Sequence, residues 1–91
     1  MEHYETGKPI TLLMKEWIRE QKQFYHNVIG GCVEQVTDKA VKIRTYSGHM
    51  EWFPKSAIMV LDGPRNKTLA EVEYSLTPAQ ISWAGIEPAE A

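Results

Sequence analysis

The sequence predicts an α+β protein, mainly β: a small, bent antiparallel barrel or roll, SH3-like or OB-like, with an N-terminal amphipathic helix and a short C-terminal helix. Three observations predict this class. A segment with a helical apolar period comes first, short alternating segments with tight turns follow, and a helix-capping pattern stands near the C-terminus. The 91 residues have apolar surface for one core. We therefore predict one domain, 1–91, with loose ends at 1–8 and 86–91.

The first predicted element is a helix over residues 10–24. Its apolar residues recur with a helical period, at Ile10, Leu13, Met14, Trp17, Ile18, Phe24 and Tyr25. Most positions between them are charged or polar, and Pro9 stands where a first helical turn tolerates a residue without an amide proton. This period predicts that Trp17 and Phe24 pack into the core.

Residues 27–36 and 40–46 predict two strands. Gly30-Gly31 interrupts the first, which indicates a bulge or a close backbone approach and hence a strongly bent strand. In the second strand apolar and polar side chains alternate. The pattern places Val41, Ile43 and Thr45 toward the core, and Lys42, Arg44 and Tyr46 on the opposite face.

A hairpin turn is predicted at Ser47-Gly48-His49. In the strand after it, Met50 and Trp52 share one face, for which we predict the core. Pro54 cannot donate to a β ladder, so that strand ends there. A tight turn then leads into a short apolar strand over 58–61.

Two further elements are predicted near the C-terminus. Residues 68–74 alternate and predict a final strand. Thr77-Pro78-Ala79-Gln80 combines a capping hydroxyl, a proline at the first helical position and a glutamine that closes a capping box, so we predict a short helix that ends at Gly85. The predicted core unites both parts of the chain and consists of Val41, Ile43, Trp52, Ile58 and Val60 with Leu13, Trp17 and Ile18.

Charge is distributed unevenly along the chain. The formal net charge is -2, which argues against coating nucleic acid by bulk electrostatics. Basic residues are nevertheless in excess over 37–67, and acidic residues over 68–91. One cysteine and no signal-peptide pattern predict a cytoplasmic protein, and no apolar run approaches the roughly 20 residues that span a bilayer, so we predict no membrane partner.

The residue patterns predict no enzyme, no metal site and no cofactor. His3, His26 and His49 have no ligand spacing with one another, with a cysteine or with a carboxylate. Cys32 lies in an apolar, glycine-bounded segment, which favours an inert thiol over a nucleophile. No nucleophile elbow and no phosphate-binding loop is present.

Basic and aromatic residues form the candidate ligand site. The set consists of Lys42, Arg44 and Tyr46 with Lys39, Lys55, Arg65 and Lys67. Small barrels bind single strands with cations that meet phosphates and rings that stack on bases. The alternative is that these side chains are the ordinary solvated face of an alternating strand.

The run "VTDKAVKIRTYSGHMEWFPKSAI" resembles a pattern found in small proteins of phage and other prokaryotic mobile elements. In those proteins a turn, Lys-Ala, an alternating strand and a hairpin precede Trp-x-Pro-Lys-Ser, and an amphipathic segment with a tryptophan, here "ITLLMKEWIREQK", often comes before them. The resemblance covers about half of the chain. It implies a small β-barrel of phage or mobile-element origin and brings no established activity.

Two classes of function remain open. The first is a small non-enzymatic binding module that holds single-stranded nucleic acid, or a nucleotide, on the basic and aromatic sheet face. The alternative is a protein-interaction module, such as a phage-encoded inhibitor, an adaptor or a small oligomeric assembly protein, which the negative net charge and the aromatic content favour. Phe24, Tyr25 and Trp83 exceed what one small core can bury, so we also predict a homodimer or a larger homo-oligomer.

Overall fold

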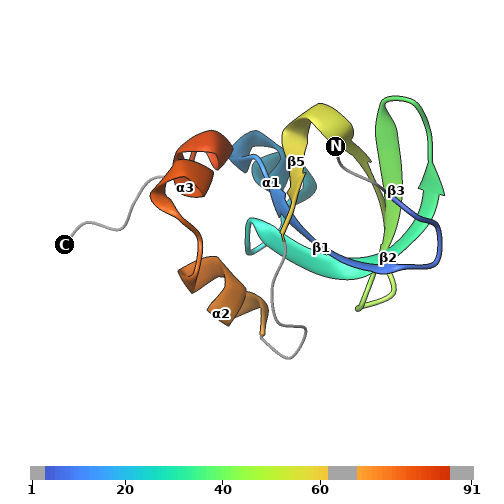
Figure 1. Ribbon diagram of the computed structural model, residues 1–91, viewed down its shortest axis with the longest axis horizontal. Coiled ribbons are helices and arrows are strands. Elements are labelled where there is room, and N and C mark those ends of the chain that lie inside the picture. Colours follow the sequence, from blue (N-terminus) through green and yellow to red (C-terminus); the bar gives the residue numbers. More distant parts are fainter. Residues whose placement is uncertain (1–3, 62–67, 87–91) are drawn as a thin grey trace.

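The computed structural model describes residues 4–61 and 68–86 and has an α+β architecture, mainly β, built on one five-stranded antiparallel sheet (Figure 1). The strands are β1 (Pro9–Met14), β2 (Val28–Val36), β3 (Ala40–Thr45), β4 (Met50–Pro54) and β5 (Ile58–Val60). The helices are α1 (Glu16–Lys22), α2 (Leu69–Tyr74) and α3 (Pro78–Ala84), and a 3-10 turn, η1 (Lys55–Ala57), joins β4 to β5. No helix in these described ranges has the length and the apolar character to cross a bilayer.

The sheet is strongly bent. Its strands lie in the order β4-β3-β2-β1-β5, so β4 and β5 are the two edges. Within the described residues these edges do not pair with each other, and the sheet is not closed into a barrel. The bend runs through β2, which pairs with both β1 and β3, as Figure 1 shows. The predicted α+β, mainly β class with an antiparallel sheet is confirmed, whereas the predicted barrel stays a prediction.

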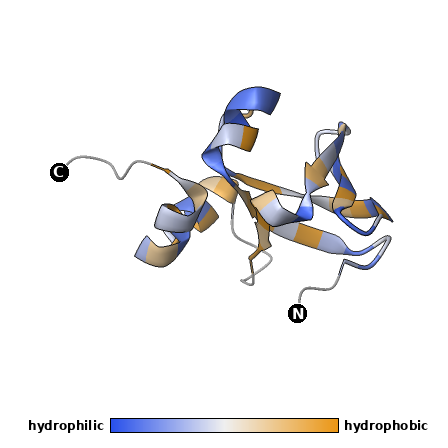
Figure 2. Cartoon of the chain, turned by 90° about the horizontal axis from the view of Figure 1, so that it is seen from above, coloured by the Kyte–Doolittle hydropathy of each residue, from blue (hydrophilic) through white to orange (hydrophobic). Residues whose placement is uncertain are grey.

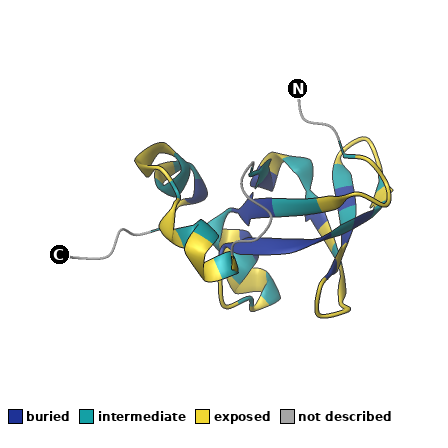
Figure 3. Cartoon of the chain, turned by 60° about the horizontal axis from the view of Figure 1, so that its bottom comes forward, coloured by how far each residue is buried: buried dark blue, intermediate teal, exposed yellow. Residues whose placement is uncertain are grey.

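Apolar cores fill both sides of this sheet. The core inside the bend consists of Leu12, Met14, Ile18, Ile29, Val33, Val41, Ile43, Phe53, Ala57 and Ile58. On the outside, α2 and α3 cover one end of the sheet, where Leu13, Val28 and Ala84 form a second core. Hydrophobic residues are frequent along the strands (Figure 2), and the tight turns are exposed while much of the strands is buried (Figure 3).

The prediction of one helix over 10–24 is wrong in its first half, because Pro9–Met14 is strand β1. Leu12 and Met14 face the core inside the bend, while Leu13 faces the core outside it. A strand buried on both faces needs apolar residues at successive positions. The resulting run has the spacing of a helical stripe, which is why the period alone did not identify the strand.

Helix α1 presents its two large apolar side chains in opposite ways. Ile18 is buried, as predicted, but Trp17 is 54% exposed, so its assignment to the core is wrong. Because α1 begins only at Glu16, the apolar positions of the preceding strand do not continue the face of the helix. Phe24, just beyond α1, does pack on the core and stacks on Phe53 with ring centroids 6.2 Å apart.

The hairpin of β3 and β4 corrects the position of Trp52. Val41 and Ile43 are buried as predicted, and Val41 lies opposite Phe53. Directly opposed residues of an antiparallel pair point to the same face. Phe53 therefore fills the core at 0% exposure, whereas Trp52, opposite Lys42, points outward and is 40% exposed.

The segment predicted as a final strand is instead helix α2. The Thr68 side chain accepts a hydrogen bond from the Glu71 amide, and the Glu71 carboxylate accepts one from the Thr68 amide. This capping box outweighs a weak alternation. The next helix, α3, is confirmed, with the Thr77–Gln80 capping box and Gly85 in the left-handed conformation at φ 79°.

A polar cluster ties α1 to the start of β2. The Glu16 carboxylate accepts hydrogen bonds from Arg19 Nε at 2.7 Å, Arg19 Nη2 at 2.6 Å and Asn27 Nδ2 at 3.0 Å. The hydrogen bonds from Arg19, helped by the one from Asn27, lower the pKa of Glu16 from 4.5 to about 2, against the opposing effect of burial. The backbone amide of Asn27 donates to Glu73 Oε2 at 3.1 Å, which connects α2 to the start of β2.

Replacing Glu16 by Gln should therefore lower the free energy of unfolding by about 1 to 2 kcal/mol at neutral pH. The folded protein holds the Glu16 proton less tightly than the unfolded chain does, so the contribution is complete above pH 4.5 and is lost as pH falls toward about 2. Urea unfolding of both proteins across this range should show their difference shrinking. Glu20→Gln, at an exposed carboxylate 3.9 Å from Arg19, is the control with little effect. A difference in unfolding free energy that stays unchanged down to the lowest pH would refute the stabilising role of the Glu16 carboxylate.

Candidate functional site

One part of the outer sheet surface forms an open face. In the part of the chain that the structure describes, no element covers β3 and β4 on this side, because α2 and α3 lie at the other end of the sheet (Figure 1). We call this surface the open face, and its residues are Cys32, Glu34, Lys42, Arg44, Tyr46, Met50 and Trp52. Strand register brings them together, since Cys32, Arg44 and Met50 lie opposite one another across three strands and Lys42 lies opposite Trp52.

Lys42 and Trp52 form a cation–aromatic pair on the open face. Lys42 Nζ lies 5.9 Å from the centroid of the Trp52 ring. The pair comes directly from the hairpin register, which places the two residues side by side on β3 and β4. The indole is exposed enough to accept a flat ligand, and the ammonium beside it can meet an anion.

Arg44 is the second cation of the open face, and it already has a partner. Its Nη2 lies 3.3 Å from Glu34 Oε2 on β2, and both side chains contact solvent. An exposed ion pair of this kind contributes little to stability. It does hold the guanidinium beside Glu34 and neutralises part of its charge.

Tyr46 marks the boundary of the open face near the hairpin turn. Its amide donates to the Gly30 carbonyl at 3.3 Å, and its ring rests on Gly30, where an added Cβ would lie 2.7 Å from Tyr46 Cε2. The ring is 70% exposed. The close approach that the sequence indicates at the glycine pair is therefore present. At Gly30 the absence of a Cβ lets the Tyr46 ring pack directly on the backbone.

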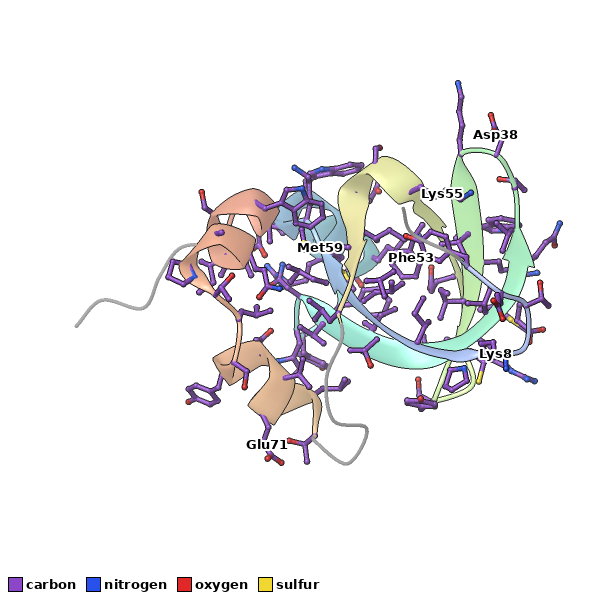
Figure 4. All side chains as sticks on the ribbon, viewed as in Figure 1. Lys8, Asp38, Phe53, Lys55, Met59 and Glu71 are labelled. Atoms are coloured by element: carbon purple, nitrogen blue, oxygen red, sulfur yellow. The ribbon has the colours of Figure 1, made fainter. Side chains whose placement is uncertain are left out.

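The remaining predicted site residues do not lie on this face. The Lys55 amide donates to the Lys39 carbonyl at 2.8 Å, so both residues belong to the far end of the hairpin, where Figure 4 shows Lys55 beside the turn that contains Asp38. Lys55 Nζ lies 5.6 Å from the Tyr4 ring centroid. Arg65 and Lys67 fall outside the described residues.

A cavity of about 340 Å³ adjoins Tyr46 on the side opposite Lys42 and Arg44. Its lining comes from the connection between α1 and β2 (residues 24–26), the first part of β2 (28–30), the end of β3 with its turn (45–47), and Leu69 of α2. The lining is mostly apolar and aromatic. No local sequence pattern indicates this cavity, because its four segments are brought together only by the bend of β2 and the docking of α2.

The remaining titratable groups include a free thiol and a histidine–carboxylate pair. Among the described residues, no three or more His, Cys, Asp or Glu side chains gather where they could hold a metal ion. Cys32 is a free, half-buried thiol opposite Arg44. His26 Nδ1 lies 3.2 Å from Glu73 Oε1 and so joins the α1–β2 connection to α2.

Comparison with protein-family models, curated proteins and solved structures finds no match to this chain. The open face and the cavity are therefore interpreted from their own chemistry.

Proposed function

We propose that this protein is a small non-enzymatic binding module that holds single-stranded nucleic acid on the open face. One observation carries the proposal: two exposed aromatic rings and two cations share this uncovered surface, with Trp52 beside Lys42 and Tyr46 following Arg44 along the chain. Single-strand binding needs this combination, because rings stack on bases of any sequence and cations neutralise phosphates. A free nucleotide offers the same two groups and is the smallest ligand of this class.

The geometry supports stacking more strongly than the sequence did. The sequence pattern predicts Trp52 in the core and therefore a site with one ring, whereas the open face has two. Tyr46 rests on Gly30, and Trp52 lies beside Lys42, so both rings are accessible to a ligand on the uncovered surface.

The charge of the face is modest, and this sets the expected affinity. Arg44 shares its charge with Glu34, so Lys42 is the cation of the pair without a carboxylate partner among the contacts described. Stacking should therefore contribute more than phosphate neutralisation. We expect moderate affinity at low salt with a shallow dependence on salt concentration.

The proposal includes three finer expectations. The first is an SH3-like barrel. The edge strands β4 and β5 are joined by the three-residue turn η1, and β1 pairs directly with β5. This pairing supports the SH3-like alternative over the OB-like one. The others are a cytoplasmic location and an origin in phage or another mobile element, which rest on the sequence alone.

Alanine substitutions test the proposal by fluorescence anisotropy with a labelled single strand of about 12 nucleotides, DNA or RNA. Trp52→Ala and Tyr46→Ala should each weaken binding by about 1 to 3 kcal/mol, the free energy of one stacked base. Trp17→Ala is the matched control, because it removes an exposed tryptophan from α1 and not from the open face. A wild-type protein that does not bind even at low salt would reject the proposal.

Charge variants separate phosphate contacts from stacking in the same titration. Lys42→Ala with Arg44→Ala should make the salt dependence shallower by about 1 unit of slope, whereas Lys8→Ala, which removes an exposed charge outside the face, should not. Glu34→Gln should strengthen binding severalfold, because it frees Arg44 and removes a carboxylate near the phosphates. Weaker binding by Glu34→Gln would contradict this role of Arg44.

A protein-interaction module is the second candidate, and a specific observation favours it. Strand β4 is an edge of the sheet and exposes Met50 and Trp52, so an extended peptide or a second copy of the chain has both a backbone edge and an apolar surface to meet. The predicted homo-oligomer stays a prediction. Phe24 and Trp83, two of the residues that suggested it, pack against the inner and outer cores, while Tyr25 is 94% exposed.

A further inference from the structure

We propose that the cavity beside Tyr46 holds one nucleobase of the bound strand. This inference rests on the proposed function and adds a subsite to it. Its size points to a single flat ring system, since about 340 Å³ is near the lower end of the roughly 300 to 1,000 Å³ of small-molecule sites. An oligonucleotide does not fit such a space, but one base that leaves the strand does.

The position of the cavity connects it to the open face. Tyr46 lines the cavity and also belongs to the open face, at its boundary, so the two surfaces share this side chain. A strand whose phosphates meet Lys42 and Arg44 and whose base stacks on Tyr46 brings its next base to the mouth of the cavity. The sugar–phosphate backbone can remain in solvent while this base turns inward.

The lining is mostly apolar and suits the flat faces of a base. Phe24 and Tyr46 offer aromatic surfaces, and Val28 and Leu69 offer apolar contact. The Thr45 hydroxyl is already engaged, because it bonds to the Ser47 hydroxyl at 2.9 Å and accepts from the His49 amide at 3.1 Å. The Ser47 hydroxyl lies on an exposed turn and keeps hydrogen-bonding capacity for the polar edge of a base.

The Glu73 carboxylate, which contacts the cavity residue His26, does not oppose such a ligand. The Glu73 carboxylate is engaged by His26 Nδ1 at 3.2 Å and by the Asn27 amide at 3.1 Å, and it does not line the cavity. The His26 ring lines the cavity from the α1–β2 connection. An incoming strand would therefore meet His26, which can form hydrogen bonds, and not the Glu73 carboxylate, which is already hydrogen-bonded.

Methyl NMR signals of Val28, Ile29 and Leu69 provide the direct test, because these side chains line the cavity and lie away from the Lys42 and Arg44 side of Tyr46. A single strand of about 12 nucleotides should shift them together with the amides of the open face. The same strand made entirely of abasic sites should shift the open-face amides and leave these methyl signals unchanged. Adenosine and thymidine, as free nucleosides, should shift the methyl signals at high concentration.

Ser47→Phe places a ring at the mouth of the cavity on an exposed turn. It should weaken binding of the base-containing strand by about 5- to 150-fold, equivalent to one lost stacking contact, and leave the abasic strand unaffected. His49→Phe, in the same hairpin but outside the cavity lining, is the matched control.

The outcomes separate the inference from the proposed function. Binding on the open face with unmoved cavity methyl signals would overturn the nucleobase site and leave the proposed function intact. Methyl shifts with nucleosides but no binding of any strand would reject the proposed function and retain a nucleoside site. No response to either ligand would overturn both.

Discussion

Replacing Phe53 by Ala should lower the free energy of unfolding by about 3 to 5 kcal/mol. Phe53 is 0% exposed, stacks on Phe24 and lies opposite Val41. Figure 4 shows Phe53 inside the bend of the sheet. Truncation would remove its apolar contacts and leave a cavity between β3, β4 and the end of α1. Urea unfolding followed by circular dichroism measures the loss.

Trp52→Ala is the matched variant, one residue away on the same strand. Trp52 points to the open face, so its removal should cost less than half as much as the loss of Phe53. Equal losses, or a larger loss for Trp52, would mean that β4 is registered one residue differently against β3 and that the open face is misassigned.

Gly31→Ala should also be strongly destabilising, with a loss of about 2 to 3 kcal/mol. A Cβ at this position would lie 2.3 Å from the Arg44 carbonyl oxygen and 2.9 Å from Thr45 Cα. Both atoms belong to the backbone of β3, which cannot turn aside as a side chain can. The strands would have to separate where β2 bends, and thermal unfolding would report the change.

Gly30→Ala is the control, because its added Cβ would meet only the Tyr46 ring, at 2.7 Å from Cε2. This exposed ring can swing outward, so the loss of stability should be well below that of Gly31→Ala. The same variant should weaken nucleic-acid binding, because the added methyl group displaces the Tyr46 ring from its position on Gly30. Equal destabilisation by the two alanines would contradict the close approach of β3 to Gly31.

The sequence predicted elements whose local pattern has one interpretation. Apolar and polar residues alternate along β3, because one face of this strand is buried and the other is exposed to solvent. Helix α3 has a capping box, a proline at its start and a glycine at its end. Strand β1 was mistaken for a helix because burial on both faces removes the alternation. The capping box of Thr68 and Glu71 was present in the sequence and would have identified α2.

The candidate site was predictable only in part. Alternation correctly placed Lys42, Arg44 and Tyr46 on one face. The membership of Trp52 depends on which residue of β4 lies opposite which residue of β3, and that register is set by the turn and the core together. The Glu34 partner of Arg44 and the cavity depend on contacts between strands and helices that no local pattern encodes.

The central claim is that single-stranded nucleic acid binds to the open face, and the indole N–H signals of the three tryptophans test it most directly. A single strand of about 12 nucleotides is titrated at low salt into nitrogen-15-labelled protein. We predict that the Trp52 indole signal and the amides of β3 and β4 shift, while the indole signals of Trp17 on α1 and Trp83 on α3 remain in place. A Trp17 or Trp83 shift with an unmoved Trp52, or no shift at all, would contradict the account.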